Sequence, residues 1–357
     1  MEKPRIITAA NFITDDKTNK VFVSSWIDKP TGNLDLTEDD KHLLKDEILK
    51  TGQFCGLLYN TTDIWARDYM PIQLTDDLFL SYTYKPDYLN KYPTSVTNWQ
   101  LHGVSTKDNN KTKVPFEGTV VQMPVILDGG NVIKAVCKGQ PCMVMCNKVL
   151  KENNVSEATF RMWWNEWWKN NFMGTKMGLV LLPWEGMEKN PIGHADGMVR
   201  YIGEGRVLMA NYYGLDPTNN DRDGEEIYKS LAKSFGEENV VRLDFRKFKK
   251  EHQAEKLCRD LYPSSWCYIN YLHVNGTVLV PQLGYPELDK EACAQINEAF
   301  SQVKDRSCVR LICVDMTHVV AEMNDFFNSG GALNCLTWTI LSKQDIADRA
   351  LPDGWSG

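Results

Sequence analysis

The sequence predicts an α/β protein made of five similar units, and two observations indicate this fold. First, a β-hairpin, a helix and a further strand follow one another three times between residues 131 and 314. Second, the hairpins begin near residues 67, 131, 197, 267 and 335, which are 64, 66, 70 and 68 residues apart. A period this regular is typical of repeat architectures, and a last unit that only the N-terminus can complete indicates a closed ring.

The N-terminal segment supplies the elements that the last hairpin lacks. Residues 20–26, KVFVSSW, read as a strand. Residues 37–52 have helical spacing, with a threonine N-cap at one end and a glycine at the other, and residues 53–59, QFCGLLY, read as a strand. We therefore expect this segment to pair with the hairpin that begins at Cys335.

The remaining units follow in chain order. The unit that begins at residue 67 has a clear hairpin, RDYMPIQLTDDLFLSYTY, but its helix is hard to identify between residues 86 and 113. The other three units repeat hairpin, helix and strand, and their ranges are 131–146, 156–170 and 177–184, then 197–213, 223–235 and 239–245, then 268–282, 288–300 and 308–314. Ser156 is a typical N-cap for the Trp-rich helix.

Composition narrows the class of protein. Of the 357 residues, 43% are apolar and 24% are charged, which is typical of a globular chain, and we expect one domain over residues 1–357 with residues 342–357 as a C-terminal extension. The net charge of -7 without a basic run argues against nucleic acid or an anionic membrane as partners. No signal-peptide core or run of about 18 apolar residues occurs, so we expect a soluble cytoplasmic protein.

The ten cysteines fit a reducing compartment and do not indicate a metal site. Cys137, Cys142 and Cys146 lie close together in the sequence, but they lack the C-x2-C pairs that zinc sites usually show. This stretch is better interpreted as two strands joined by the KGQP turn.

Polar residues stand at the head of every hairpin. If equivalent ends of five units meet at one axis, a thiol, an imidazole, three carboxylates and two carboxamides converge there. These head residues are Asp68, Asp128, Asn131, His194, Asp196, Asn270 and Cys335.

Five motifs carry a resemblance to a known family. They are TDIWARDYMP, LDGGNVI, GHADGMVRYI, YINYL and GGALNCLTW, in this order. Over about residues 20–341 the sequence resembles the agmatine deiminase and bacterial (Porphyromonas-type) peptidylarginine deiminase family of guanidino-modifying enzymes. The resemblance implies a pentein fold, a five-bladed α/β propeller with pseudo-fivefold symmetry, and no metal or organic cofactor.

The resemblance also implies a role for each matched residue. Cys335 would be the nucleophile and His194 the acid/base, while Asp68 and Asp196 would hold the guanidinium and Asp128 would support the histidine. The sequence departs from the family at Asp128, where Glu is common, and at Asn334, where agmatine deiminases usually carry His.

The residue types agree with this chemistry. A guanidinium offers paired N–H donors to two carboxylates, a thiolate can add to its central carbon, and one imidazole can protonate leaving ammonia and then deprotonate water. Nearby carboxylates disfavour the thiolate, so either protonated His194 pairs with it or the bound cation promotes its formation. Trp65 is a candidate for stacking on the guanidinium, and Asn270 and Asn131 are candidates for lining the site or for bonding to backbone.

The sequence therefore predicts a hydrolase for a small cationic guanidino compound. Agmatine is the leading substrate, with N-carbamoylputrescine and ammonia as products, which would place the enzyme in polyamine biosynthesis. The alternatives are a deiminase of peptidyl or free arginine, an amidinotransferase, and a non-catalytic pentein binding protein. A cysteine amidase is a more distant alternative, because it leaves Asp68 and Asp196 unexplained. A homo-oligomer is compatible with the sequence.

Overall fold

The computed structural model describes most of the five predicted units. The described residues are 6–24, 48, 54–58, 64–86, 118–184, 193–213, 222–254, 256–257, 267–303, 310–315 and 331–343. Apart from Ile48, which is helical, the helix expected at residues 37–52 lies outside them, as do nearly all of residues 86–113 and residues 344–357.

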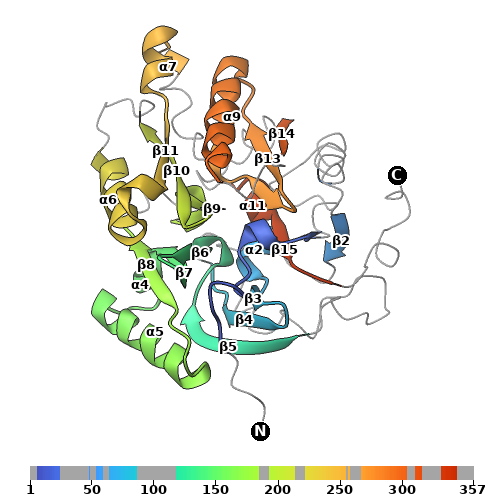
Figure 1. Ribbon diagram of the computed structural model, residues 1–357, viewed down its shortest axis with the longest axis vertical. Coiled ribbons are helices and arrows are strands. Elements are labelled where there is room, and N and C mark those ends of the chain that lie inside the picture. Colours follow the sequence, from blue (N-terminus) through green and yellow to red (C-terminus); the bar gives the residue numbers. More distant parts are fainter. Residues whose placement is uncertain are drawn as a thin grey trace.

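Strands and short helical turns alternate along the chain, with longer helices in the later units (Figure 1). The strands are β1 (Lys20–Ser24), β2 (Phe54–Leu58), β3 (Ile72–Thr75), β4 (Leu78–Thr83), β5 (Thr119–Ile126), β6 (Ile133–Cys137), β7 (Gln140–Cys146), β8 (Gly178–Leu182), β9 (Val199–Gly203), β10 (Arg206–Tyr213), β11 (Val240–Asp244), β12 (Leu272–Val274), β13 (Thr277–Gln282), β14 (Arg310–Asp315) and β15 (Thr337–Ile340). The helices are η1 (Asp15–Lys17), α2 (Ala66–Tyr69), η3 (Gly129–Asn131), α4 (Lys148–Glu152), α5 (Glu157–Asn171), η4 (Ala195–Gly197), α6 (Arg222–Phe235), η5 (Glu237–Asn239), α7 (Arg246–Glu251), α9 (Pro286–Ser301) and α11 (Leu333–Leu336).

Five three-stranded sheets share one strand pattern in the described part of the chain. Their orders are β15-β1-β2, β3-β4-β5, β6-β7-β8, β9-β10-β11 and β12-β13-β14. In each sheet the first two strands are antiparallel and the third is parallel to the middle strand. The predicted repeat of hairpin and returning strand is therefore confirmed.

The two ends of the described chain complete one sheet together. Strand β1 pairs antiparallel with β15, with Val21 opposite Thr339, and pairs parallel with β2 on its other edge. The expectation that the N-terminal strands complete the unit of Cys335 is therefore confirmed.

Helices lie outside the sheets and present one apolar face to them. In Figure 1, α5, α6 and α9 lie at the periphery, and each connects the middle strand of a sheet to its third strand. Helix α5 begins where predicted, since Ser156 Oγ accepts the Thr159 N–H at 3.2 Å. It buries Phe160, Trp164 and Trp168 at helical spacing. No helix of the described residues has the length and apolar character needed to cross a membrane.

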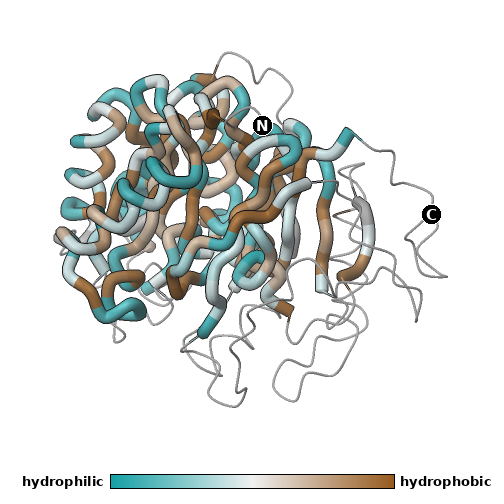
Figure 2. The backbone as a smooth tube through the Cα atoms, turned by 90° about the horizontal axis from the view of Figure 1, so that it is seen from below, coloured by the Kyte–Doolittle hydropathy of each residue, from teal (hydrophilic) through white to brown (hydrophobic). Residues whose placement is uncertain are grey.

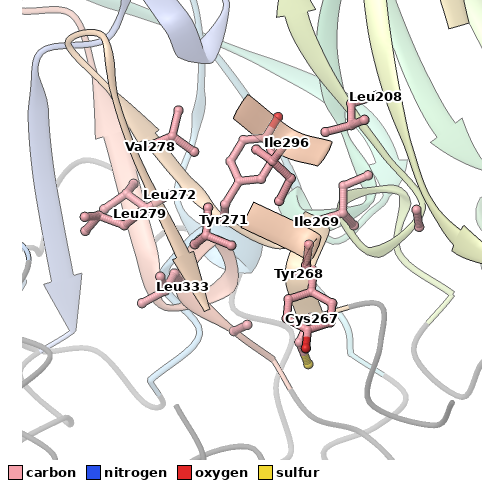
Figure 3. Close-up of a cluster of buried hydrophobic side chains, with 14 of the residues drawn as sticks. Leu208, Cys267, Tyr268, Ile269, Tyr271, Leu272, Val278, Leu279, Ile296 and Leu333 are labelled. Atoms are coloured by element: carbon pink, nitrogen blue, oxygen red, sulfur yellow. The ribbon is translucent and has the colours of Figure 1, made fainter. Parts of the chain in front are cut away.

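The core consists mainly of strand residues. Figure 2 shows apolar segments running through the strands and more polar segments in the peripheral helices. One large cluster lies around β12 and β13, and Figure 3 shows Leu333 of α11 beside Leu272 and Leu279 of these strands. The turn that carries Cys335 is thus anchored in a hydrophobic core.

A short helical turn, which the sequence did not predict, precedes the first strand of each sheet. These turns are α2, η3, η4, residues 267–269 and α11. Cys335 therefore lies in a helical turn, two residues before β15, and not at the head of the strand itself. Each turn closes with a local backbone bond, such as Leu336 N–H to Ala332 O at 3.1 Å, which fixes the direction of its side chains.

Candidate active site

Cys335 is buried at the meeting point of three of these turns, with 5% of its surface exposed. Its Sγ donates a hydrogen bond to Asp196 Oδ2 at 3.3 Å and accepts one from Asn270 Nδ2 at 3.2 Å. Asn270 also positions the turn, because its Oδ1 accepts the backbone N–H groups of Asn334 and Cys335 at 3.1 and 3.3 Å. Side chains from the turns that precede β9 and β12 therefore orient the thiol.

His194 lies between two carboxylates. Its Nε2 is 2.9 Å from Asp128 Oδ2, and its Nδ1 is 3.7 Å from Asp68 Oδ1. Burial lowers the pKa of His194, but Asp68 and Asp128 outweigh burial and raise this pKa to about 9. The imidazolium, which can donate from both nitrogens, is therefore the favoured form below that pH.

Asp68 and Asp196, the two predicted guanidinium-binding carboxylates, both lie next to Gly130. A Cβ atom on this glycine would lie 2.5 Å from Asp68 Oδ1, 2.8 Å from His194 Nδ1 and 3.3 Å from Asp196 Oδ2. The Gly130 N–H also donates to Asp68 Oδ1 at 2.8 Å. All three groups therefore surround a point that only glycine leaves open.

Trp65 and Asn131 contact backbone next to this cluster. A Cβ atom on Gly331, four residues before Cys335, would lie only 2.0 Å from a ring atom of Trp65, so the indole packs directly on the glycine. Asn131 Oδ1 accepts the N–H groups of Cys146 and Ala195 at 2.7 and 3.2 Å, and its Nδ2 donates to Cys146 O at 3.2 Å. Asn131 thus ties β7 to η4, and substrate contact by either residue stays a prediction.

The thiol itself is held in its neutral form. Burial raises the pKa of Cys335 well above its ordinary value, and the charges of Asp196 and Asp68 raise it further. A neutral S–H is also the form that can donate to the Asp196 carboxylate, as the 3.3 Å contact requires. Ionisation of this thiol therefore needs a nearby positive charge.

The hydrogen bonds around Cys335, and not the described surface pocket, define the site. A pocket of about 590 Å³ lies between η1 and the turns of β6–β7 and β9–β10, and none of the predicted site residues lines it. Among the described residues, no group of three or more His, Cys, Asp or Glu side chains is arranged to hold a metal ion.

Comparison with known proteins places this arrangement in a family. The model of the Porphyromonas-type peptidyl-arginine deiminases matches residues 36–340, which is most of the chain. The chain belongs to this family. A search of curated proteins gave no match.

Solved structures share the fold of this deiminase-family chain. An agmatine deiminase of Enterococcus faecalis is 14% identical and superposes with a TM-score of 0.60, over 94% of this chain and 96% of that one. The agmatine deiminase of C. jejuni is 15% identical, with a TM-score of 0.58 over 93% and 96% of the two chains. The α/β fold with several small sheets is therefore that of pentein-type proteins.

Asn334, the departure noted before the nucleophile, has a defined position in this family member. Its Nδ2 donates to Asp196 Oδ2 at 2.7 Å, the same oxygen that accepts from Cys335. The neutral amide thus orients a carboxylate beside the thiol without adding a titratable group.

Gly130, Lys148 and Glu152 contribute to the site and were not among the candidate residues predicted from the sequence. Gly130 could be suspected from the GGN stretch, and the four-residue spacing of Lys148 and Glu152 allows a helical ion pair. Nothing in the sequence indicates that this pair is buried or that Lys148 Nζ lies 3.8 Å from Asp128 Oδ2.

Proposed function

We propose that the chain is a guanidino-group deiminase that converts agmatine to N-carbamoylputrescine and ammonia. The observation that carries the proposal is the convergence of four groups around Gly130 and Cys335. They are the Cys335 thiol, the His194 imidazole and the carboxylates of Asp68 and Asp196, with Asp128 bonded to the far side of the imidazole. Asp68 and Asp196 match the paired N–H donors of a guanidinium, which would explain two buried carboxylates beside a nucleophile.

The proposed reaction has two steps. The Cys335 thiolate adds to the guanidinium carbon, and the C–N bond breaks as His194 donates a proton to the leaving ammonia. Water then attacks the S-alkylthiouronium carbon and gives one proton to His194. The C–S bond breaks as the new hydroxyl group loses its proton to solvent, which releases the neutral ureido product and the thiolate. Asp128 would hold the imidazole in place through both steps.

The charges around the thiol favour one of the two predicted routes to the thiolate. Because Asp196 and Asp68 raise the pKa of Cys335 beyond the effect of burial, a cation bound to these carboxylates would remove the obstacle. We therefore infer that the substrate guanidinium promotes ionisation of its own nucleophile.

The five sheets support a wider proposal about architecture. Their common strand order, and the meeting of three of their first turns at Cys335, support a five-bladed propeller with pseudo-fivefold symmetry in a single domain. The expected cytoplasmic location, the possible homo-oligomer and the absence of nucleic-acid or membrane partners belong to the same proposal.

Agmatine is favoured over free arginine because the acidic surroundings would repel a substrate carboxylate. Peptidyl arginine lacks that carboxylate, and the family description names this substrate class. A panel of agmatine, arginine, a blocked arginine peptide and other guanidines, assayed for ammonia and ureido product, separates these candidates. Turnover of the blocked peptide at least as fast as agmatine would contradict the agmatine assignment.

The nucleophile is tested with Cys335→Ala. We expect this variant to fold, to bind guanidines and to release no ammonia, while acid quenching of the wild type traps an adduct on Cys335. An active, folded Cys335→Ala protein would rule out the mechanism. Transfer of the amidino group to an added amine would reveal an amidinotransferase, and binding without any turnover would support the non-catalytic alternative.

A further inference from the structure

A buried ion pair lies next to Asp128, the carboxylate that contacts His194. Lys148 and Glu152 belong to the five-residue helix α4, and Lys148 Nζ is 3.1 Å from Glu152 Oε1. Their side chains are only 1% and 8% exposed. Burying a lysine is costly even when it is paired, so its position calls for a physical explanation.

One oxygen atom of Asp128 links the Lys148–Glu152 pair to His194. Asp128 Oδ2 is 3.8 Å from Lys148 Nζ and 2.9 Å from His194 Nε2. Glu152, Lys148, Asp128 and His194 thus form a row in which negative and positive groups alternate. Among the described residues, Asp128 Oδ1 and Glu152 Oε2 are buried and have no hydrogen-bond partner, so the ion pairs of this row are made by Asp128 Oδ2 and Glu152 Oε1.

Two carboxylates outside this row, Asp68 and Asp196, also lie near His194. Asp68 faces Nδ1 from α2, and Asp196 lies beyond the open point at Gly130, next to the neutral Cys335 thiol. Lys148, from α4, is the nearby cation that opposes protonation of His194. Glu152 offsets Lys148 in turn, although burial and then Asp128 raise the pKa of Glu152 to about 7.

We propose that Lys148 and Glu152 are positioning residues that set the protonation state of His194 through Asp128. The positive charge of Lys148 partly offsets the effect of the Asp128 carboxylate on the imidazole. The negative charge of Glu152 in turn partly offsets the effect of Lys148. The link to catalysis rests on the proposed function, since His194 there must first donate a proton and then accept one.

The two residues are expected to act in opposite directions. Lys148→Met removes a cation, so the imidazolium becomes more stable and the pKa of His194 rises. Glu152→Gln leaves Lys148 with less compensation, so this pKa falls. We expect each change of one unit charge to shift the pKa of His194 by about 0.5 to 1.5 units.

The experiment is an NMR titration of the His194 ring in the unliganded protein, with the resonance assigned by its loss in His194→Asn. The wild type, Lys148→Met, Glu152→Gln and Lys148→Arg are compared between pH 5 and 11. We expect Lys148→Met to raise the midpoint, Glu152→Gln to lower it, and Lys148→Arg, which keeps the charge, to stay near the wild type.

A matched pair elsewhere in the chain supplies the control. Lys247 and Glu251 have the same four-residue spacing on α7, with Nζ 3.9 Å from Oε1, but are 84% and 56% exposed. Lys247→Met and Glu251→Gln should leave the His194 midpoint unchanged. If Lys148→Met does not fold, the downward shift in Glu152→Gln and the unchanged midpoint in Lys148→Arg still decide the matter.

Shifts in the same direction for Lys148→Met and Glu152→Gln, or an unmoved midpoint in both of these variants when folded, would overturn the proposal. Because the titration needs no substrate, it can be interpreted even if every guanidine is inert, so its failure and that of the deiminase function are distinguishable. With an active enzyme, Lys148→Met should also move the pH–rate profile to higher pH and increase the trapped adduct, because water attack needs neutral His194.

Discussion

At the scale of single residues, Asp68 and Asp196 are the groups that would distinguish a guanidinium from a neutral ligand. Both are at least 97% buried beside Cys335 and His194, so a charge-assisted bond to either should count strongly. We expect Asp68→Asn and Asp196→Asn each to weaken guanidinium binding by roughly 1.5 to 3 kcal/mol. Calorimetry in a Cys335→Ala background measures the loss of binding free energy in each variant, with an uncharged urea analogue as the control ligand. Equal losses for both ligands would mean that these aspartates act through folding.

The same pair of carboxylates bears on the ionisation of Cys335. Since burial and then Asp196 and Asp68 raise the pKa of this thiol, alkylation of the empty enzyme should require alkaline pH. A non-reactive guanidinium ligand that leaves the thiol accessible should lower the midpoint of the alkylation profile. Mass spectrometry of the labelled peptide follows Cys335 against the other cysteines. An identical profile with and without ligand would instead favour a pre-formed thiolate–imidazolium pair.

At the scale of elements, the short turn η3 controls the spacing of the site. An added Cβ at Gly130 would approach Asp68, His194 and Asp196, so we expect Gly130→Ala to remove most of the activity while the fold persists. Gly139→Ala in the β6–β7 turn is the matched control, because nothing lies within 4 Å of its Cβ position. Its positive φ of 75° should cost stability without affecting turnover per folded molecule. Ammonia release and thermal unfolding of both variants are compared, and full activity in Gly130→Ala would refute this role.

The elements also show how far the sequence could predict the molecule. Hairpins, returning strands and the cap at Ser156 depend on local patterns, so they were predictable from turns and periodicity. The helical turns were not, because four residues such as Leu333–Leu336 carry no period of their own. Repeat spacing nominated Asp196, Asn270 and Cys335 together, and the structure does join them.

Contacts that depend on tertiary packing were beyond the reach of the sequence. The spacing of Lys148 and Glu152 allowed a helical pair, but its burial depends on tertiary contacts, such as the close approach of Lys148 to Gly193. Asn131 was nominated both for the substrate and for backbone, and only the structure shows its bonds to Cys146 and Ala195. A buried amide is equally suited to either use, so residue type could not decide.

At the scale of the whole molecule, one carboxylate joins several sheets. Asp15 in η1 lies 3.0 Å from Arg200 Nη2 of β9, 3.7 Å from Lys134 Nζ of β6 and 3.9 Å from Arg67 Nη1 of α2. Burial raises the pKa of Asp15, but Arg67, Lys134 and Arg200 outweigh it and hold this pKa well below its ordinary value. The N-terminal segment therefore completes one sheet through β1 and, through Asp15, also contacts β6, β9 and α2 of three other units.

This arrangement predicts a large effect for a single neutral substitution. Asp15→Asn leaves the buried Arg200 and Lys134 without their shared counter-charge, so we expect a loss of about 3 kcal/mol in the free energy of unfolding near neutral pH. A carboxyl group whose pKa is depressed in the folded state stabilises the fold fully at pH values above its ordinary pKa, and this stabilisation is lost as the pH falls. The difference in the free energy of unfolding between Asp15→Asn and the wild type should therefore narrow on acidification. Urea unfolding at several pH values measures both effects. Asp76→Asn is the control, since Asp76 pairs with Lys343 at 3.0 Å on the exposed surface and should change stability by less than about 0.5 kcal/mol. Equal small losses in both variants would show that Asp15 does not hold the sheets together.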